Sequence, residues 1–205
     1  MAYFPFFIDI KDKPFLVVGG GNVALRKVRK LLPFEPKITL CAPEICEEIL
    51  DIDGIIIKRR KFEERDLEGV FAVISATSDE QLNSRIYEIC KEKNILVNTV
   101  DIPDKCGFIF PALVKKNDIS VGVSTGGKSP LYAKYLRKKL DRLITEEDVN
   151  AIEFLGEIRP RIKAEIADEE KRKAAFERVL QLCIDSGKPP EKAEINRIIQ
   201  EYKSK

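Results

Sequence analysis

The sequence predicts an α/β protein with a doubly wound parallel sheet, followed by a small central α+β module and a helical C-terminal region. Three observations lead to this prediction. Short apolar runs alternate with helical stretches through the first hundred residues, and a glycine-rich turn joins the first run to the first helical stretch. Beyond residue 101 the alternation stops, and amphipathic helical patterns take over from residue 146.

Five apolar runs are the predicted strands of the sheet. The first, PFLVV at residues 14–18, is apolar throughout, which is typical of a strand buried on both faces. The other four runs lie at 37–41, 54–58, 70–76 and 95–100. Helical stretches separate them at 22–32, at 43–50 and from a cap at Ser78 or Asp79 to about residue 93. This order indicates right-handed βαβ units and hence parallel strands.

The pattern of the second half is different. Runs at 107–114 and 119–124 are joined by a polar link at 115–118 with no helix between them, so we expect an antiparallel pair. A basic helix begins at Ser129-Pro130, and three amphipathic helices follow, broken near 167–168 and at 187–190. We therefore expect a sheet domain at 1–112, a central module at 113–144 and a helical domain at 145–205.

The composition excludes several kinds of chemistry. The chain has 205 residues, with 36 Lys and Arg against 34 Asp and Glu, and it has no histidine. A net charge of +2 gives no argument for nucleic-acid binding. Without imidazole, histidine-based nucleophile systems, zinc sites and proton shuttles are unavailable, so proton transfer falls to Asp, Glu, Lys, Tyr or Cys. We expect no metal site.

Cysteine usage and hydropathy bear on location. The five cysteines form no CxxC pair, and we expect reduced, mostly buried thiols. The apolar start, MAYFPFFIDI, lacks a basic region and is interrupted by Pro5 and Asp9, so it does not resemble a signal peptide. No apolar run approaches the roughly 20 residues that cross a bilayer. These features predict a cytoplasmic protein without a membrane partner.

The turn after the first strand matches the pattern G-x-G-x-x-A. In Rossmann-type sheets this dinucleotide fingerprint combines a tight turn, close approach of the backbone to a pyrophosphate and close packing of the helix on the strand. Because a strand precedes the turn and a helix follows it, we interpret it as a cofactor site rather than a simple connection. The predicted cofactor-binding residues are Gly19, Gly20, Gly21, Asn22, Val23 and Ala24.

The fingerprint lacks its usual acidic residue at the end of the second strand, which binds the ribose 2′-OH. The sequence there is Cys41-Ala42-Pro43-Glu44, and only Glu44 could serve. Glu44 could equally be an acid in the first turn of a helix. No arginine follows the strand to bind a 2′-phosphate, so NAD is favoured over NADP.

Two further segments could contribute chemistry. Asp101 follows the fifth strand, at the sheet edge where ligands of open α/β sheets bind, although an aspartate two residues before a proline is also common in turns. The loop Ser124-Thr125-Gly126-Gly127-Lys128-Ser129 opens a helix rich in cations and suits an anion with several carboxylates or phosphates. The alternative is a capped helix with a solvated basic face.

With these motifs in view, the sequence resembles the siroheme synthase family, in its precorrin-2 dehydrogenase module. The resemblance covers about residues 3–140. The motifs that carry it are Phe4–Phe7, Val17–Ala24 with Arg26 and Lys27, Ser75–Asp79, Asn98–Pro103, Phe108–Ala112 and Ser124–Pro130.

The resemblance implies NAD-dependent oxidation of precorrin-2 to sirohydrochlorin in siroheme biosynthesis, by a homodimer. It implies that Asp101 is the general base. It also implies that Pro43, Glu44, Ala76 and Thr77 join the glycine loop in holding NAD, and that residues 124–129 bind the tetrapyrrole, a polycarboxylate. Some family members carry serine where this chain has Thr125.

Two alternatives remain open from the sequence. A bifunctional dehydrogenase and ferrochelatase would also insert iron, with a carboxylate accepting the pyrrole protons. A non-catalytic NAD-sensing module would bind the cofactor without turnover, but this reading does not account for Asp101 or for the loop at 124–130.

Overall fold

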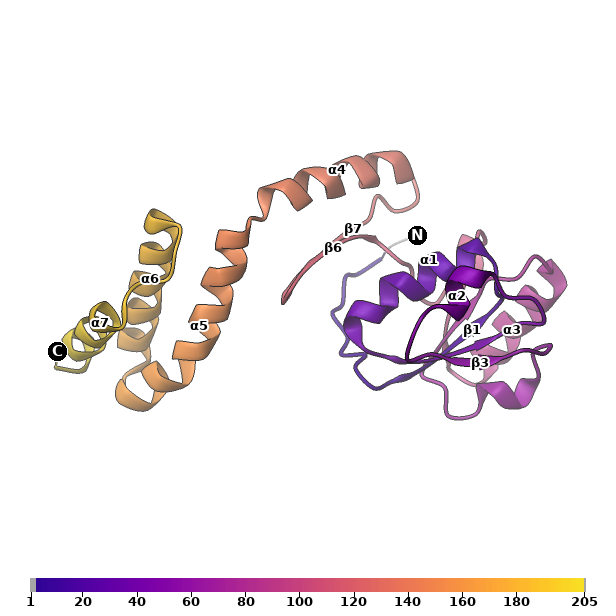
Figure 1. Ribbon diagram of the computed structural model, residues 1–205, viewed down its shortest axis with the longest axis horizontal. Helices are drawn as coiled ribbons and strands as arrows, with labels where there is room; N and C mark the ends of the chain where they lie inside the picture. The colour runs from indigo at the N-terminus through magenta and orange to yellow at the C-terminus, as the bar shows by residue number, and fades with distance from the viewer. Residues whose placement is uncertain (1–2, 205) are drawn as a thin grey trace. The chain divides into compact units, whose positions relative to one another are not determined.

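The computed structural model describes residues 3–204, which fall into two compact units (Figure 1). The first unit comprises residues 6–110, and the second comprises residues 111–204 together with residues 3–5. No helix within the described range 3–204 is long and apolar enough to span a bilayer.

The first unit is a five-stranded sheet in which every pairing is parallel. The strand order is β3-β2-β1-β4-β5, so the chain starts at the centre, winds outward on one side and then on the other. This is the predicted doubly wound α/β sheet, and the prediction is confirmed. The elements in chain order are β1 (Pro14–Val18), α1 (Asn22–Leu31), η1 (Leu32–Phe34), β2 (Lys37–Cys41), α2 (Glu47–Leu50), β3 (Ile56–Lys58), η2 (Glu64–Leu67), β4 (Ala72–Ser75), α3 (Glu80–Glu92), β5 (Leu96–Thr99) and η3 (Pro103–Lys105).

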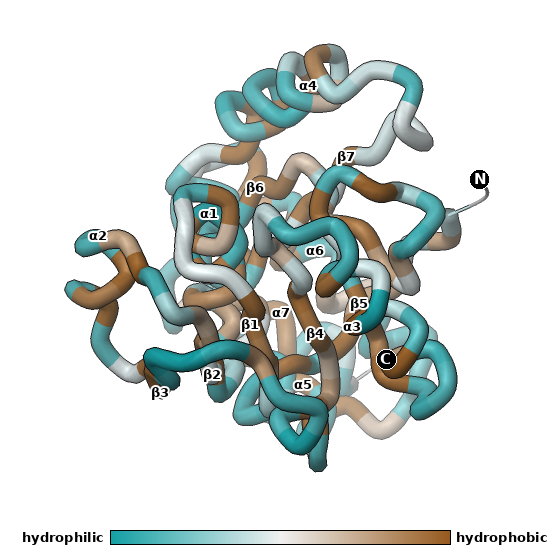
Figure 2. Tube along the Cα trace, turned by 90° about the vertical axis from the view of Figure 1, so that its right-hand side faces the viewer, coloured by the Kyte–Doolittle hydropathy of each residue, from teal (hydrophilic) through white to brown (hydrophobic). Residues whose placement is uncertain are grey.

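Apolar layers cover both faces of this sheet. Alternate residues of β1, such as Val17 and Leu16, enter opposite layers. One layer packs α1 onto the sheet through Ala24, Leu25 and Val28, and the other packs α3 through Ile86 and Cys90. Strands β1 and β4 are mainly hydrophobic in Figure 2, as two buried faces require.

Two local expectations are wrong. The helix expected at 43–50 is only α2, a single turn beginning at Glu47, so Pro43 and Glu44 lie in a loop. The strand expected at 107–114 begins only at Ala112. Ahead of it, the Gly107 amide donates to the Val97 carbonyl at 2.7 Å, so this segment packs on β5 without forming a regular strand.

The second unit begins with a hairpin. Strands β6 (Ala112–Lys116) and β7 (Ile119–Val123) pair antiparallel, as expected, through a turn of only Asn117 and Asp118. Asn117 takes the positive φ (43°) that such short turns need. Four helices follow, with the start at Ser129-Pro130 and the two breaks that the sequence predicts: α4 (Pro130–Leu143), α5 (Glu146–Glu165), α6 (Glu169–Ser186) and α7 (Lys192–Ser204).

Candidate functional site

The carboxyl edge of the parallel sheet gathers most of the predicted site residues. The strand registers end together, with Val18 beside Cys41 and Ser75, and Ser75 beside Thr99. The segments that follow β1, β2, β4 and β5 therefore emerge at one edge. They carry the glycine loop, Pro43 with Glu44, Ala76 with Thr77, and Asp101.

The first two glycines of the loop are fixed by close neighbours. Gly19 has a φ of 117°, which favours glycine, and a Cβ built on it would overlap the Ala76 carbonyl oxygen. A Cβ on Gly20 would overlap the Glu44 carbonyl oxygen. Gly21, in contrast, faces open space: apart from its neighbours in the chain, no atom lies within 4 Å of the position of a Cβ. The loop thus packs against the segments after β4 and β2 and leaves its third glycine accessible.

Helix α1 starts at this open position without a capping side chain. Gly21 is its N-cap, no side chain accepts a hydrogen bond there, and the first turn has no acidic residue. The amides of the first turn and the positive end of the helix dipole therefore suit an anion. An open glycine beside an uncapped helix start is what the pyrophosphate of a dinucleotide requires, so the residues present fit this cofactor.

The loop after β2 is tied to the glycine loop. The Cys46 amide donates to the Gly20 carbonyl at 2.9 Å, and Glu44 is exposed ahead of α2. Glu44 is therefore not an acid in the first turn of a helix, which removes that alternative. Its role toward a ribose stays a prediction.

The structure also brings an arginine to the end of β2, which sequence reasoning missed. The Cys41 thiol donates to the Arg60 carbonyl at 3.4 Å. The Arg60 guanidinium binds both oxygens of Asp66, at 2.7 and 2.6 Å, and the Lys58 ammonium binds Oδ1 at 2.7 Å. We call Asp66, Arg60, Lys58 and Cys41 the Asp66 cluster. The Arg60 guanidinium is therefore already paired with the Asp66 carboxylate.

The Asp66 carboxylate is buried, and its partners compensate for the burial. The Asp66 side chain is 1% exposed, and the Glu63 amide also donates to it at 3.0 Å. The hydrogen bonds from Arg60 hold the pKa of the Asp66 carboxyl well below its usual range, although burial alone would raise it. The cluster therefore pairs the Asp66 carboxylate with its donors and favours its ionised form.

Asn83 organises the loop after β4. Its Oδ1 accepts from the hydroxyls of Ser75 at 2.7 Å and Thr77 at 2.8 Å, and its Nδ2 donates to the Thr77 carbonyl at 3.0 Å. Asp79 caps α3 through the amides of Gln81 and Leu82, as expected for one of the two predicted caps. The Thr77 hydroxyl is therefore engaged within its own loop. Asn83 was not singled out by the sequence.

Asp101 lies in an unusual backbone conformation beyond β5. Its φ is 60°, a left-handed value that aspartate tolerates better than most residues, and its side chain is exposed. The Cys106 thiol closes the segment behind it: its sulfur lies 3.2 Å from the Thr99 carbonyl oxygen and 3.4 Å from that of Ile102, so its single S–H can donate to either. The carboxylate is therefore presented at the edge by a braced turn.

A lysine lies close to this turn. The Lys27 ammonium, from α1, donates to Asn98 Oδ1 at 3.2 Å and lies 4.2 Å from the centre of the Phe110 ring. We call these three residues the Lys27 cluster. Burial, with Lys30 and Arg26 in support, lowers the pKa of Lys27 to about 8, while Cys106 and Asp101 oppose the shift.

The predicted substrate loop belongs to the second unit. The Thr125 hydroxyl accepts from the Ser129 amide and donates to the Ser129 carbonyl, and the Ser129 hydroxyl caps α4 at the Tyr132 amide. The Ser124 hydroxyl accepts from the Gly126 amide at 3.2 Å. Gly126 and Gly127 both have positive φ, and Lys128 is exposed. The loop is therefore a turn stabilised by its own hydrogen bonds, with Lys128 exposed to solvent.

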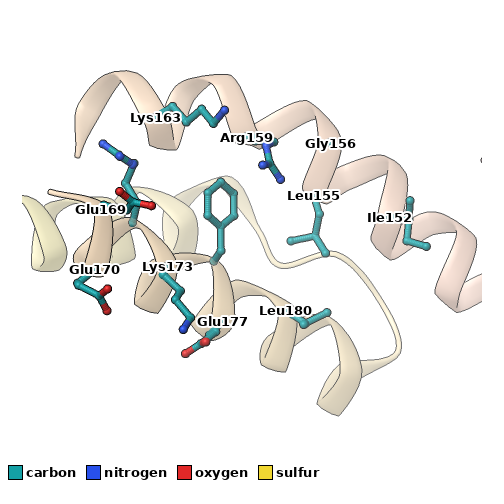
Figure 3. A pocket seen from close by; sticks show the side chains of 12 residues that line it. Ile152, Leu155, Gly156, Arg159, Lys163, Glu169, Glu170, Lys173, Glu177 and Leu180 are labelled. Atoms are coloured by element: carbon teal, nitrogen blue, oxygen red, sulfur yellow. The ribbon is translucent and has the colours of Figure 1, made fainter. Parts of the chain in front are cut away.

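A groove of about 820 Å³ lies between α5 and α6 (Figure 3). Its apolar residues include Leu155 and Phe176, and the Arg159 guanidinium lies 5.7 Å from the centre of the Phe176 ring. Three glutamates accompany the four cations of its lining, so the groove does not present a simple anion site. None of the predicted site residues lines it. Within residues 3–204, no group of three or more Cys, Asp and Glu side chains could hold a metal ion.

A parallel sheet with an open glycine loop and an uncapped helix at its carboxyl edge defines a Rossmann-type dinucleotide-binding protein. Comparison with known proteins agrees. Residues 6–112 match a family described as "Putative NAD(P)-binding", and residues 116–143 match "Sirohaem biosynthesis protein central". The chain therefore belongs to this NAD(P)-binding family, and it is similar to the siroheme synthases that the sequence resembles.

Individual relatives support the assignment. The siroheme synthase of Thioalkalivibrio sulfidiphilus is 40% identical over 184 residues, which are 88% of this chain and 38% of the relative. That of Pseudoalteromonas translucida is 36% identical, over 91% of this chain and 40% of the relative. The chain thus spans about two fifths of the length of these relatives. A solved structure titled SirC, precorrin-2 dehydrogenase, superposes with a TM-score of 0.75 at 25% identity, covering 99% of this chain and all of that one. The predictions of family, fold class and a nicotinamide dinucleotide cofactor are confirmed.

Proposed function

We propose that this protein oxidises precorrin-2 to sirohydrochlorin with NAD⁺, a step of siroheme biosynthesis. The observation that carries the proposal is the grouping of an open glycine loop and the Asp101 carboxylate at one sheet edge. The full-length similarity to a precorrin-2 dehydrogenase supports it.

The residues that would hold the cofactor are the glycine loop and its two neighbouring segments. Amides at Asn22, Val23 and Ala24 would bind the pyrophosphate, with Pro43 and Glu44 on one side and Ala76 and Thr77 on the other. Bound NAD⁺ supplies the hydride acceptor.

The engagement of Arg60 favours NAD over NADP. A 2′-phosphate needs a free cation near the end of β2, and the guanidinium there is held by Asp66.

Asp101 would serve as the general base. Conversion of precorrin-2 to sirohydrochlorin removes one hydride and one proton, and the carboxylate accepts the proton from carbon as the hydride leaves. Because Asp101 is exposed at the end of a braced turn, a substrate can reach it. The loop Ser124–Ser129, with its exposed Lys128, would bind carboxylates of the tetrapyrrole.

The second unit supports a homodimer. Helix α4 exposes large apolar side chains, with Leu131 81% and Leu143 72% exposed, and an apolar hollow lined by Val123, Leu136 and Leu140 lies beside them. We propose that this surface, which lies in the predicted central module at 113–144, pairs with a second copy of the chain. We also propose a cytoplasmic location, because the cysteines of residues 3–204 are all free.

The proposal is tested by anaerobic turnover of precorrin-2 with NAD⁺, following NADH absorbance and sirohydrochlorin together. We expect one NADH for each sirohydrochlorin. A parallel reaction with ferrous iron reports whether siroheme also forms. Binding of NAD⁺ without NADH production would contradict the proposal and favour the sensing module.

A further inference from the structure

The Lys27 ammonium is a half-buried cation without an ion pair within residues 3–204. It reaches from the second turn of α1 to Asn98 Oδ1 at 3.2 Å, and Phe110 covers it at 4.2 Å. Burying a charge is costly unless it is compensated, and one hydrogen bond with one ring contact compensates it only in part. Such a group calls for an explanation beyond packing.

Its hydrogen bond fixes the orientation of Asn98. With Oδ1 accepting from Lys27, the Asn98 Nδ2 donates to the Phe108 carbonyl at 2.9 Å and contacts the Cys106 sulfur at 3.5 Å. Asn98 is 5% exposed, so water cannot replace a lost partner easily. Lys27 therefore determines how Asn98 binds the segment 106–108, which runs back along β5.

That returning chain closes the turn that carries Asp101. Gly107 pairs with Val97, and Asn98 forms a β-bridge with Cys106, whose thiol lies within hydrogen-bond distance of the Thr99 and Ile102 carbonyls. Asp101 lies between these fixed points with its left-handed φ of 60°. A strained residue keeps its conformation only where its surroundings hold it. Asn98 is central to that support.

We propose that Lys27 is a positioning residue, which acts through Asn98 to hold the Asp101 turn in its reactive conformation. This inference rests on the proposed function and adds a residue to its site. The charged and titratable groups that face Lys27 are Arg26 and Lys30 on α1 and Asp101 and Cys106 on the turn.

The charge of Lys27 makes the inference testable through pH. Because the pKa of Lys27 is about 8, the ammonium loses its charge in a range where the enzyme can be assayed. The charge-assisted bond to Asn98 and the attraction to Asp101 weaken as pH rises. We expect turnover to fall above about pH 8, with NAD⁺ affinity unchanged.

Two substitutions of Lys27 separate positioning from packing. Lys27→Met keeps the aliphatic length but removes the donor, and we expect kcat to fall about 10- to 100-fold with NAD⁺ affinity retained. Lys27→Arg keeps the charge to high pH, so the alkaline fall should move upward. Arg29→Met, an exposed position on the same helix, is the matched control and should match the wild type.

A readout independent of turnover is amide hydrogen exchange of residues 99–108. We expect exchange there to be about fivefold faster in Lys27→Met than in the wild type or Arg29→Met, with the sheet unchanged. This result distinguishes the inference from the proposed function, because the exchange can be measured even if precorrin-2 is not turned over.

Wild-type kcat and wild-type exchange in Lys27→Met would overturn the inference. An alkaline fall that stays in place in Lys27→Arg would overturn it as well. If Lys27→Met does not fold, Lys27→Arg and Asn98→Ala decide: Asn98→Ala should reproduce the kcat loss, and an Asn98→Ala variant with normal kcat would contradict the proposal.

Discussion

Two charged clusters lie in the same Rossmann-type unit and differ in how their charges are satisfied. In the Asp66 cluster, a carboxylate that is 1% exposed binds two cations at 2.6–2.7 Å. In the Lys27 cluster, a half-buried ammonium has one neutral acceptor at 3.2 Å and no ion pair within residues 3–204. Both pKa values are lowered, but for opposite reasons: partners stabilise the charged form of Asp66, whereas burial destabilises the charged form of Lys27.

The difference separates a structural role from a functional one. The Asp66 cluster joins the end of β2, the end of β3 and η2 with every charge paired, which is expected of a scaffold. The Lys27 cluster retains an incompletely compensated charge next to the Asp101 turn. Unsatisfied charges of this kind gather at functional sites, where their cost is borne by the rest of the fold.

The largest expected effect is on the Asp66 cluster. Asp66→Asn leaves two cations beside a neutral amide, and we expect a loss of about 3–5 kcal/mol in the free energy of unfolding, measured in urea. The matched control is Glu64→Gln, which breaks the exposed pair of Glu64 with Lys93 and should cost less than about 1 kcal/mol. Similar losses in both variants would show that the Asp66 cluster is not the structural centre described here.

A smaller effect should distinguish the two cations of the Asp66 cluster. Arg60 donates to both carboxylate oxygens and Lys58 to one, and both side chains are about one third exposed. We expect Arg60→Met to cost about 1–2 kcal/mol and Lys58→Met less than about 1 kcal/mol in urea unfolding. The reverse order would contradict the geometry.

The loss of stability at acidic pH should depend on Asp66. Its folded-state pKa is depressed, so the stabilisation is present above the unfolded value near 4 and is lost as pH falls below it. We expect the melting temperature of the wild type to fall on acidification below about pH 4 more steeply than that of Asp66→Asn. If the melting temperatures of the two proteins fall equally steeply with pH, Asp66 is not the source of the acid sensitivity.

The change of stability at alkaline pH should depend on Lys27, and this is the smallest of the expected effects. Because its pKa is lowered to about 8 in the folded state, the folded protein binds fewer protons than the unfolded chain up to the usual lysine value near 10.4. The contribution of Lys27 to stability therefore rises with pH across that window. Melting temperatures across pH 8–10 should rise more, or fall less, in the wild type than in Lys27→Met. If the melting temperatures of the two proteins change equally with pH, Lys27 is not buried as a cation.

The local features were predictable from the sequence, whereas the long-range contacts were not. The glycine turn, the Asp79 and Ser129 caps and the five apolar runs are short-range patterns whose physics acts within a few residues. Lys27 meets Asn98 across 71 positions and Cys41 meets Arg60 across 19, and no local pattern encodes either contact. The expected strand at 107–114 was wrong for a related reason, because Gly107 pairs with Val97 and regular pairing begins only at Ala112.

The measurement that tests the central claim most directly compares Asp101→Asn with Asp104→Asn. Asp104 is an exposed neighbour in η3 and serves as the control. We expect both variants to bind NAD⁺ with wild-type affinity, and Asp101→Asn alone to lose about 100-fold or more in kcat for NADH formation from precorrin-2. Wild-type turnover by Asp101→Asn would contradict the assignment of Asp101 as the base at this sheet edge.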